Sequence, residues 1–275
     1  MNNLVTRYLV AGVAIPAILA LLMLAESWIF DVFVALLMMM VLFEWLQLIR
    51  SLKLAVPRIL GMSMGAVQLG GIYAFAITGN GMFLLFTTML TVLGINAYSL
   101  LNLEYDIKQR SLGNGTMLMA IILVCWGGGS LILLRELLIS PGGQYWILFL
   151  FAAAWAGDAG AMHLGRWFGK HRLAPVISPK KTVEGLIGGV LCALMAGAAV
   201  FHFCTFPYPF WHVLILAPLI VGLSHIGDLS ASMVKRTARV KDSGRMIPGH
   251  GGYLDRFDNM LLTAPFLYLY ILLVL

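Results

Sequence analysis

Nine long apolar runs, separated by short polar segments, dominate this sequence. Each run is about 20 residues long, which is the length of a helix that crosses a hydrocarbon layer roughly 30 Å thick. Lipid offers the backbone no hydrogen-bond partner, so such segments form helices. We therefore predict an all-α, polytopic membrane protein with about nine transmembrane helices. The runs cover residues 8–25, 28–49, 60–78, 82–100, 117–134, 146–166, 183–204, 211–231 and 257–275.

The composition supports a membrane environment, because 61% of the residues are hydrophobic and only 11% are charged. An ordinary globular domain carries about 25% charged residues. The formal net charge of +6 lies in loops that lack the interleaved aromatic residues of a single-strand binder. We therefore expect no nucleic-acid partner, and instead the lipid bilayer and phosphate groups. Cys125, Cys192 and Cys204 lack metal-type spacing, so they are expected to be packing residues.

The distribution of lysine and arginine predicts the orientation in the membrane. If the N-terminus is cytoplasmic, every basic residue except Arg135 falls in a segment on the cytoplasmic side. Basic residues concentrate in cytoplasmic loops, so this segregation supports nine spans and a cytoplasmic N-terminus. We expect the first run to be a retained anchor rather than a cleaved signal.

We predict a single membrane domain over residues 1–275, with N-terminal helices in 1–140 and catalytic helices and cytoplasmic loops in 141–275. The first part carries few polar residues, although an ionisable residue within a span is a functional candidate. Asp31 lies near the outer end of its run and is left out of the site. Glu44 lies near an inner end, and its role stays open, as does that of His163.

A first polar constellation begins at Asp158, about halfway along the sixth run. Small neighbours such as Gly157 and Gly160 would let a helix or a ligand approach closely, so Asp158 either contacts a ligand or ties two helices together. Further along, the segment Ser178-Pro-Lys-Lys-Thr182 precedes a run that begins with an acidic residue. Ser178 or Thr182 is a plausible helix cap, with Glu184 in the first turn. Lys180 and Lys181 would then hold a phosphate at a helix start, or would be ordinary positive-inside residues.

A second constellation places Asp228, Asp242, Asp255 and Asp258 within 31 positions. Asp228 lies towards the end of the eighth run, and the last two lie three residues apart at the start of the ninth, on one helix face. Two helix ends would therefore offer carboxylates to one space. Clustered carboxylates repel one another unless a cation neutralises them, and they favour hard ions such as magnesium.

The segment Pro248-Gly-His-Gly-Gly252 lies between these carboxylates. Glycine permits the dihedral angles of an anion-binding nest, so the backbone amides could surround a phosphate. His250 could donate to a phosphate, ligate a metal or brace the loop. The surrounding basic residues predict a pocket that binds several phosphate groups. The sequence contains no P-loop motif, so this pocket would not be a P-loop. These residues are Lys235, Arg236, Lys241 and Arg256.

These residues resemble the signature of the phosphatidate cytidylyltransferases, also called CDP-diacylglycerol synthases. Segments 43–45 and 168–185 also look like that family, so the resemblance extends across most of the chain. Departures at Ala159, Met162, Val183, Ala231 and Tyr253 leave the lipid preference and the level of activity open. The signature reads here as Ser232, Lys235-Arg236, Lys241-Asp242, Pro248-Gly249-His250-Gly251-Gly252, Asp255-Arg256 and Asp258.

The resemblance implies that CTP and phosphatidate react to give CDP-diacylglycerol and pyrophosphate. It also implies Mg2+ as cofactor, with K+ as a further candidate, and a homodimer in the bacterial inner (plasma) membrane with its active site facing the cytoplasm. The catalytic set is Asp228, Asp255, Lys241, Asp242, His250 and Arg256. The substrate- and phosphate-binding set is Asp158, Ser178, Lys180, Lys181, Thr182, Glu184, Lys235, Arg236, Gly251 and Gly252. The metal set is Asp228, Asp255 and Asp258.

We expect the phosphatidate phosphate to attack the α-phosphorus of CTP directly, so that catalysis depends on charge neutralisation and alignment. Two alternatives remain. A lipid or polyprenol kinase would share the metal and the basic loops but would release CDP or ADP. An ion-coupled transporter would use Asp158 and Asp228 as coupling sites.

Overall fold

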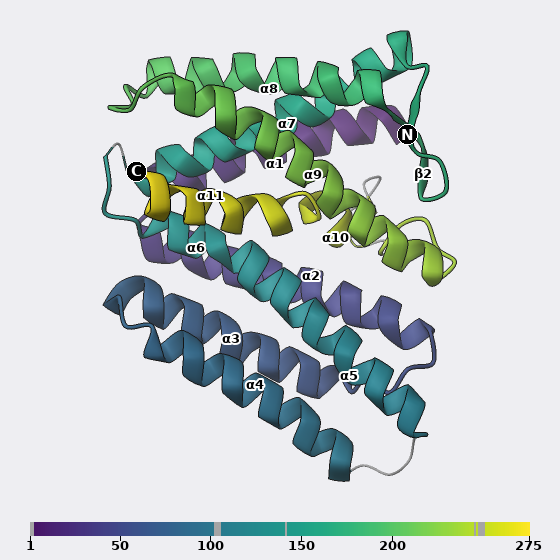
Figure 1. The fold of residues 1–275 in the computed structure, drawn as a ribbon. Helices are drawn as coiled ribbons and strands as arrows, with labels where there is room; N and C mark the ends of the chain where they lie inside the picture. Colours follow the sequence, from purple (N-terminus) through teal and green to yellow (C-terminus); the bar gives the residue numbers. More distant parts are fainter. Residues whose placement is uncertain (1–2, 102–105, 141, 245, 247–250) are drawn as a thin grey trace. The chain divides into compact units, whose positions relative to one another are not determined.

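The computed structural model describes residues 3–101, 106–140, 142–244, 246 and 251–275 (Figure 1). Helices α5, η1 and α6 run on as one span, Ile107–Arg135. In chain order the elements are α1 (Asn3–Leu24), α2 (Ser27–Ser51), α3 (Arg58–Thr78), α4 (Met82–Leu101), α5 (Ile107–Ile121), the π-helix η1 (Ile122–Gly128), α6 (Gly129–Arg135), α7 (Gly143–Phe168), β1 (Arg172–Ala174), β2 (Ser178–Thr182), α8 (Val183–Phe203), α9 (Trp211–Thr237), α10 (Leu254–Phe257) and α11 (Met260–Val274).

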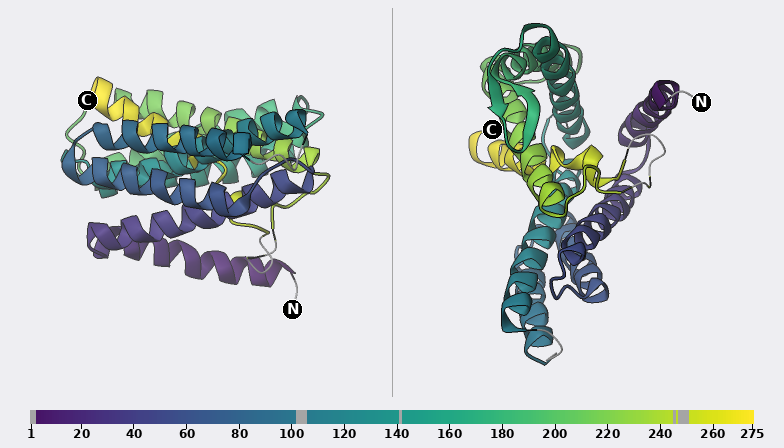
Figure 2. Two further views of the ribbon diagram at one scale, coloured as in Figure 1. Left: turned by 90° about the horizontal axis from the view of Figure 1, so that it is seen from below. Right: turned by 90° about the vertical axis from the view of Figure 1, so that its right-hand side faces the viewer.

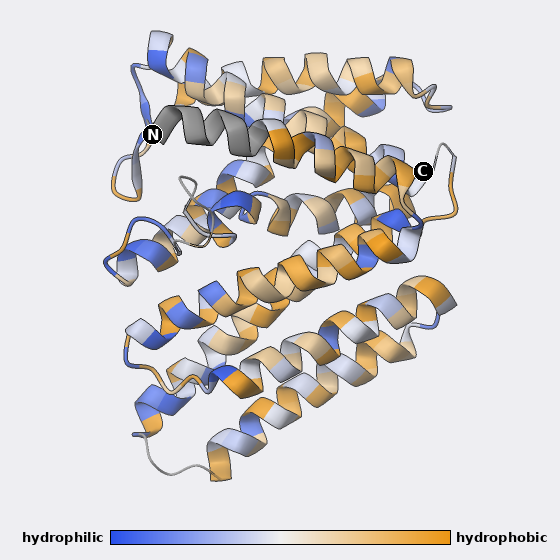
Figure 3. Ribbon diagram, turned by 180° about the vertical axis from the view of Figure 1, so that it is seen from behind, coloured by the Kyte–Doolittle hydropathy of each residue, from blue (hydrophilic) through white to orange (hydrophobic). Residues whose placement is uncertain are grey.

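Within these ranges, eight helical segments are long and apolar enough to cross a membrane, and the apolar part of α1, Gly12–Leu24, is a shorter candidate. They match the nine apolar runs, so the predicted all-α membrane fold is confirmed. In Figure 3 apolar residues predominate in the middle parts of the long helices outside the grey segment, whereas strongly hydrophilic residues gather mainly at helix ends and connections. Large apolar side chains such as Leu36, Phe86 and Met195 are exposed, as expected for a surface covered by lipid. The cytoplasmic N-terminus stays a prediction.

The chain divides into two compact units. The first contains residues 1–136 and 234–257, and the second contains residues 137–233 and 258–275. One boundary between the units falls inside α9 and another lies directly after α10. The polar residues between Asp228 and Asp258 are therefore divided between the two units. The single membrane domain, divided at residue 140, stays a prediction.

Helix α2 supplies much of the core of the first unit, with Met38, Leu42 and Trp45 almost completely buried. Two glycines allow this helix to approach its neighbours. A side chain at Gly65 of α3 would collide with Leu42, and one at Gly128 of η1 would collide with Met38. Contacts on both sides therefore fix the position of α2 and of the polar residues that it carries. In the same unit, α3 and α4 lie side by side (Figure 1).

In the second unit, α7 and α8 pack through facing glycines. Small residues let two helix backbones approach closely, which is the usual way that helices associate in lipid. The predicted close approach of a helix at Gly157 and Gly160 is therefore confirmed. The contacts reverse in order along the two helices, so the pair is antiparallel. Gly157 lies against Gly189, Gly160 against Gly188, and Gly165 against Gly185.

A β-hairpin joins these two helices (Figure 2). Strands β1 and β2 are antiparallel, with Arg172 opposite Thr182 and Ala174 opposite Ser178. We did not predict this hairpin from the sequence, because three- and five-residue strands show no clear alternation and Pro179 argues against a strand. The hairpin places the end of β2, with its lysines, directly before α8.

Candidate active site

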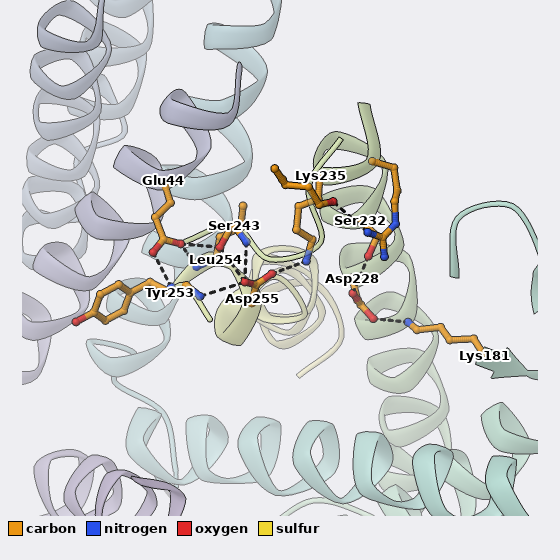
Figure 4. Close-up of polar contacts among 12 residues, drawn as sticks. Glu44, Lys181, Asp228, Ser232, Lys235, Ser243, Tyr253, Leu254 and Asp255 are labelled. Atoms are coloured by element: carbon orange, nitrogen blue, oxygen red, sulfur yellow. Dashed lines mark hydrogen bonds and ion pairs between the residues drawn. The ribbon is translucent and has the colours of Figure 1, made fainter. Parts of the chain in front are cut away.

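Glu44 holds together the polar network of the first unit (Figure 4). It lies near the C-terminal end of α2, and only 1% of the residue is exposed. Its Oε2 accepts hydrogen bonds from the Ser243 hydroxyl (2.7 Å) and the backbone N–H of Leu254 (3.0 Å). Its Oε1 accepts from the backbone N–H of Tyr253 (3.0 Å). A buried carboxylate needs such donors, so Glu44 fixes both ends of the 243–254 segment.

Asp255, in α10, is the second carboxylate of this network. Its Oδ1 accepts a hydrogen bond from Nζ of Lys235 at 2.6 Å. Its Oδ2 accepts from the backbone N–H groups of Ser243 (2.8 Å) and Gly252 (3.1 Å). The Ser243 hydroxyl also lies 3.0 Å from this oxygen, so one serine bridges Asp255 and Glu44. The side chains of Lys235 and Asp255 are each 8% exposed, so the charges are held in a largely dry site.

Two glycines make this arrangement possible. Gly251 has φ 85°, a left-handed conformation that favours glycine. A side chain at Gly252 would collide with the Ser243 hydroxyl and with Glu44. The N–H groups of residues 252–254 therefore surround carboxylates of the protein itself, and the phosphate-binding role of Gly251 and Gly252 stays a prediction.

In the second unit, Lys181 of β2 pairs with Asp228 of α9. Nζ of Lys181 lies 2.7 Å from Oδ2 of Asp228, and the Ser232 hydroxyl donates to Oδ1 at 3.3 Å (Figure 4). The side chains of Lys181 and Asp228 are 19% and 37% exposed. Both charged groups therefore remain accessible from outside the protein.

Thr182 and Glu184 position the hairpin that carries Lys181. The Thr182 side chain accepts a hydrogen bond from the backbone N–H of Gly185 (3.1 Å), so Thr182 is confirmed as the N-cap of α8. Glu184 accepts from the backbone N–H of Lys170 (3.0 Å) and lies 2.6 Å from the His171 ring. The phosphate-binding roles of both residues stay predictions, since these contacts brace the hairpin.

Replacing Thr182 with valine keeps its shape but removes the cap. We expect the free energy of unfolding to fall by about 1 kcal/mol, because an N-cap substitution typically costs that much. The measurement is the thermal unfolding midpoint in detergent. Thr182→Ser keeps the accepting oxygen and is expected to retain most of the stability. Equal midpoints for the valine and serine variants would contradict the capping role.

Asp158 joins three helical segments of the second unit. It accepts hydrogen bonds from the Ser224 hydroxyl on α9 (3.2 Å) and from the side-chain amide of Asn259, directly before α11 (2.8 Å). The residue is also exposed at the surface of the chain. The tie between helices is therefore observed, while contact with a substrate stays a prediction.

The other predicted site residues are placed as follows. The guanidinium of Arg236 donates to the carbonyl of Val240 (3.0 Å) just beyond the C-terminal end of α9. His250 lies outside the described residues. Ser178 and Lys180 lie in β2, Lys241 and Asp242 are exposed after α9, Arg256 is exposed in α10, and Asp258 is buried in the turn between α10 and α11.

The fit of these residues to a metal ion is mixed. Among the described residues, no three histidine, cysteine or acidic side chains converge. Asp228 and Asp255, however, each hold a lysine ammonium group at 2.7 Å and 2.6 Å, so each lies where a positive charge is bound. Magnesium often binds one or two carboxylates and completes its shell with water and substrate phosphates, which fits this donor set. A shared ion at Asp228 and Asp255 stays a prediction, as does a ligand role for Asp258.

Glu44 and Ser243 are the site residues that the sequence did not assign. An acidic residue within an apolar run was the signal for Glu44, but a single sequence does not show its partner. Ser243 gave no comparable signal, since a lone serine beside an aspartate and a glycine is common in loops.

Together these features define an integral membrane protein that presents paired lysines and carboxylates near helix ends. The model of the cytidylyltransferase family matches residues 5–274, and the chain belongs to this family.

Three relatives named phosphatidate cytidylyltransferase illustrate the similarity. The protein of Staphylococcus saprophyticus is 46% identical over 125 residues, which is 46% of this chain and 48% of that protein. The proteins of Staphylococcus haemolyticus and Staphylococcus aureus are each 45% identical over the same proportions. The chain spans about half the length of the curated relatives that it matches.

Proposed function

We propose that this chain is a phosphatidate cytidylyltransferase that converts CTP and phosphatidate into CDP-diacylglycerol and pyrophosphate. Family membership and the 45–46% identity to proteins of that name support the proposal. The observation that carries it in the structure is the pairing of two signature residues, Lys235 and Asp255. Ser243 and Gly252 donate hydrogen bonds to Asp255, and Glu44 accepts one from Ser243.

The reaction brings together two anions, so the residues must neutralise charge and align the phosphates. Lys180, Lys181, Lys241 and Arg256 are proposed to bind the nucleotide phosphates, and Lys235 and Arg236 the lipid headgroup. A magnesium ion bound by Asp228 and Asp255, with Asp258 as a third candidate, would supply charge stabilisation at the leaving pyrophosphate. K+ is a further candidate cofactor.

The proposed setting follows from the distribution of basic residues. They gather in the segments assigned to the cytoplasmic side, where CTP is available. On the same basis we propose that the active site faces the cytoplasm. The bacterial relatives support a bacterial inner membrane, and the homodimer is proposed from the family resemblance alone. Phosphatidate would reach the basic residues from the adjoining lipid layer.

The test uses purified protein in detergent with phosphatidate, magnesium and CTP labelled at the α-phosphate. We expect label in the lipid phase together with released pyrophosphate. Asp228→Asn is expected to reduce this transfer about 10³-fold, because the variant loses a carboxylate proposed to hold the magnesium ion that would stabilise the transition state. Asp106→Asn, at the N-cap of α5, is the matched control and is expected to keep full activity. Release of CDP with no label in the lipid would favour a kinase, and absence of any turnover by the folded wild-type protein would favour a transporter.

A further inference from the structure

An open groove with a volume of about 1140 Å³ lies in the first unit, where α2 ends and α3 begins. Most of its lining is apolar. The residues of the polar network around Asp255 do not line it. The lining residues are Phe43, Arg50, Pro57, Arg58, Ile59, Leu60, Met62, Ser63 and Tyr98.

Two arginines stand against this apolar lining. Arg50 lies in the last turn of α2, and Arg58 is the first residue of α3. Neither forms an ion pair with an acidic side chain in the described part of the chain. The Arg58 guanidinium lies 5.7 Å from the centre of the Phe43 ring, which orients it without neutralising its charge. The groove therefore offers positive charge at helix ends and an apolar surface beside it.

This combination selects the class of ligand. An apolar helix from a second copy of the chain would bury the two guanidinium groups without a counter-charge, which is costly. A small soluble anion would leave the apolar lining in contact with water. A phospholipid with an anionic headgroup satisfies both parts. Its phosphate can accept hydrogen bonds from the arginines, while an acyl chain covers the lining.

We propose that this groove binds an anionic phospholipid, with the phosphate at Arg50 and Arg58 and an acyl chain along Leu60, Met62 and Tyr98. The site goes beyond the proposed function, because it requires neither CTP nor magnesium. Its ligand is defined by a headgroup with a net negative charge, so anionic phospholipids that are not consumed by the reaction also occupy it.

Native mass spectrometry of the protein in detergent tests this site, with phosphatidylglycerol and phosphatidylcholine of identical acyl chains as probes and with CTP and magnesium omitted. Phosphatidylglycerol is expected to bind more tightly. Because one basic residue near an anionic lipid contributes about fivefold, Arg50→Gln with Arg58→Gln is expected to weaken phosphatidylglycerol binding roughly 30-fold. Lys53→Gln removes a lysine from the same connection that does not line the groove, and is expected to change nothing.

A second variant tests the apolar part. Ser63→Trp places a large ring in the groove and is expected to displace both lipids, whereas Ser63→Ala is expected to leave binding unchanged. Wild-type affinity in the arginine variant and in Ser63→Trp would overturn the proposal, as would displacement of the lipid by free glycerol 3-phosphate. If these groove variants converted dimers to monomers and left lipid binding unchanged, the lipid proposal would be overturned, and the groove would instead bind a second copy of the chain. Cytidylyl transfer is measured separately, so loss of this lipid site and failure of the proposed reaction remain distinguishable.

Discussion

Replacing Glu44 with glutamine is expected to reduce cytidylyl transfer about 100-fold. The carboxylate accepts hydrogen bonds from Ser243, Tyr253 and Leu254. Glutamine has one accepting oxygen and an amide that can only donate, so at least one buried donor loses its partner at a cost of about 1–3 kcal/mol. The segment that carries Asp255 would shift, and a displacement of about 1 Å can cost 10²-fold in rate. Transfer of the labelled α-phosphate of CTP into lipid measures this loss.

Glu26→Gln is the matched control for this prediction. Glu26 lies directly before α2 and accepts a hydrogen bond from the exposed Trp28 ring at 2.7 Å. The same chemical change at that end of the helix is expected to leave transfer unaltered. If Glu44→Gln transferred cytidylyl groups at the wild-type rate, Glu44 would not position the 243–255 segment.

The membrane-spanning helices could be predicted because the bilayer imposes a simple rule on the sequence. Their ends were less predictable. The predicted transmembrane helix 211–231 ends where polar residues begin in the sequence, yet the observed helix α9 continues to Thr237. Backbone hydrogen bonding does not stop at the edge of the hydrocarbon layer. As a result, Lys235 lies on the helix rather than in a loop.

The last span shows the opposite error. We expected Asp255 and Asp258 to share one helix face, but α10 ends at Phe257 and Asp258 lies in the turn before α11. This part of the prediction was wrong, because a spacing of three residues implies a shared face only within a continuous helix.

The sequence predicted several residues of the candidate site, but it did not predict which of them contact one another. The signature indicated Lys235 and Asp255 as functional residues, and the structure pairs them. Ser243 and Glu44 are 199 positions apart, and their contact depends on the packing of α2 in the first unit. A single sequence contains no local pattern for such a contact, whereas the N-cap at Thr182 follows from residues within one helical turn.

Replacing Lys235 with methionine is expected to destabilise the protein by roughly 3 kcal/mol and to abolish cytidylyl transfer. The Lys235 and Asp255 side chains are each 8% exposed, and breaking a buried ion pair leaves one charge without its counter-charge. Adding Asp255→Asn removes that charge and keeps an acceptor for Ser243 and Gly252. The double variant should therefore recover much of the lost stability, as measured by the unfolding midpoint, but none of the activity.

The same variant tests whether the Asp255 carboxylate accepts a magnesium ion. Methionine removes the ammonium group at 2.6 Å, so the carboxylate becomes available to another cation. A ligand that binds only the folded state raises the unfolding midpoint. Magnesium should therefore raise the unfolding midpoint of Lys235→Met but not that of the double variant. Lys108→Met, which changes an exposed lysine of α5, is the control, and its midpoint should respond to magnesium as that of the wild type does. If magnesium stabilised the single and double variants equally, the ion would bind elsewhere, and Asp255 would serve as the counter-charge of Lys235 rather than as a metal ligand.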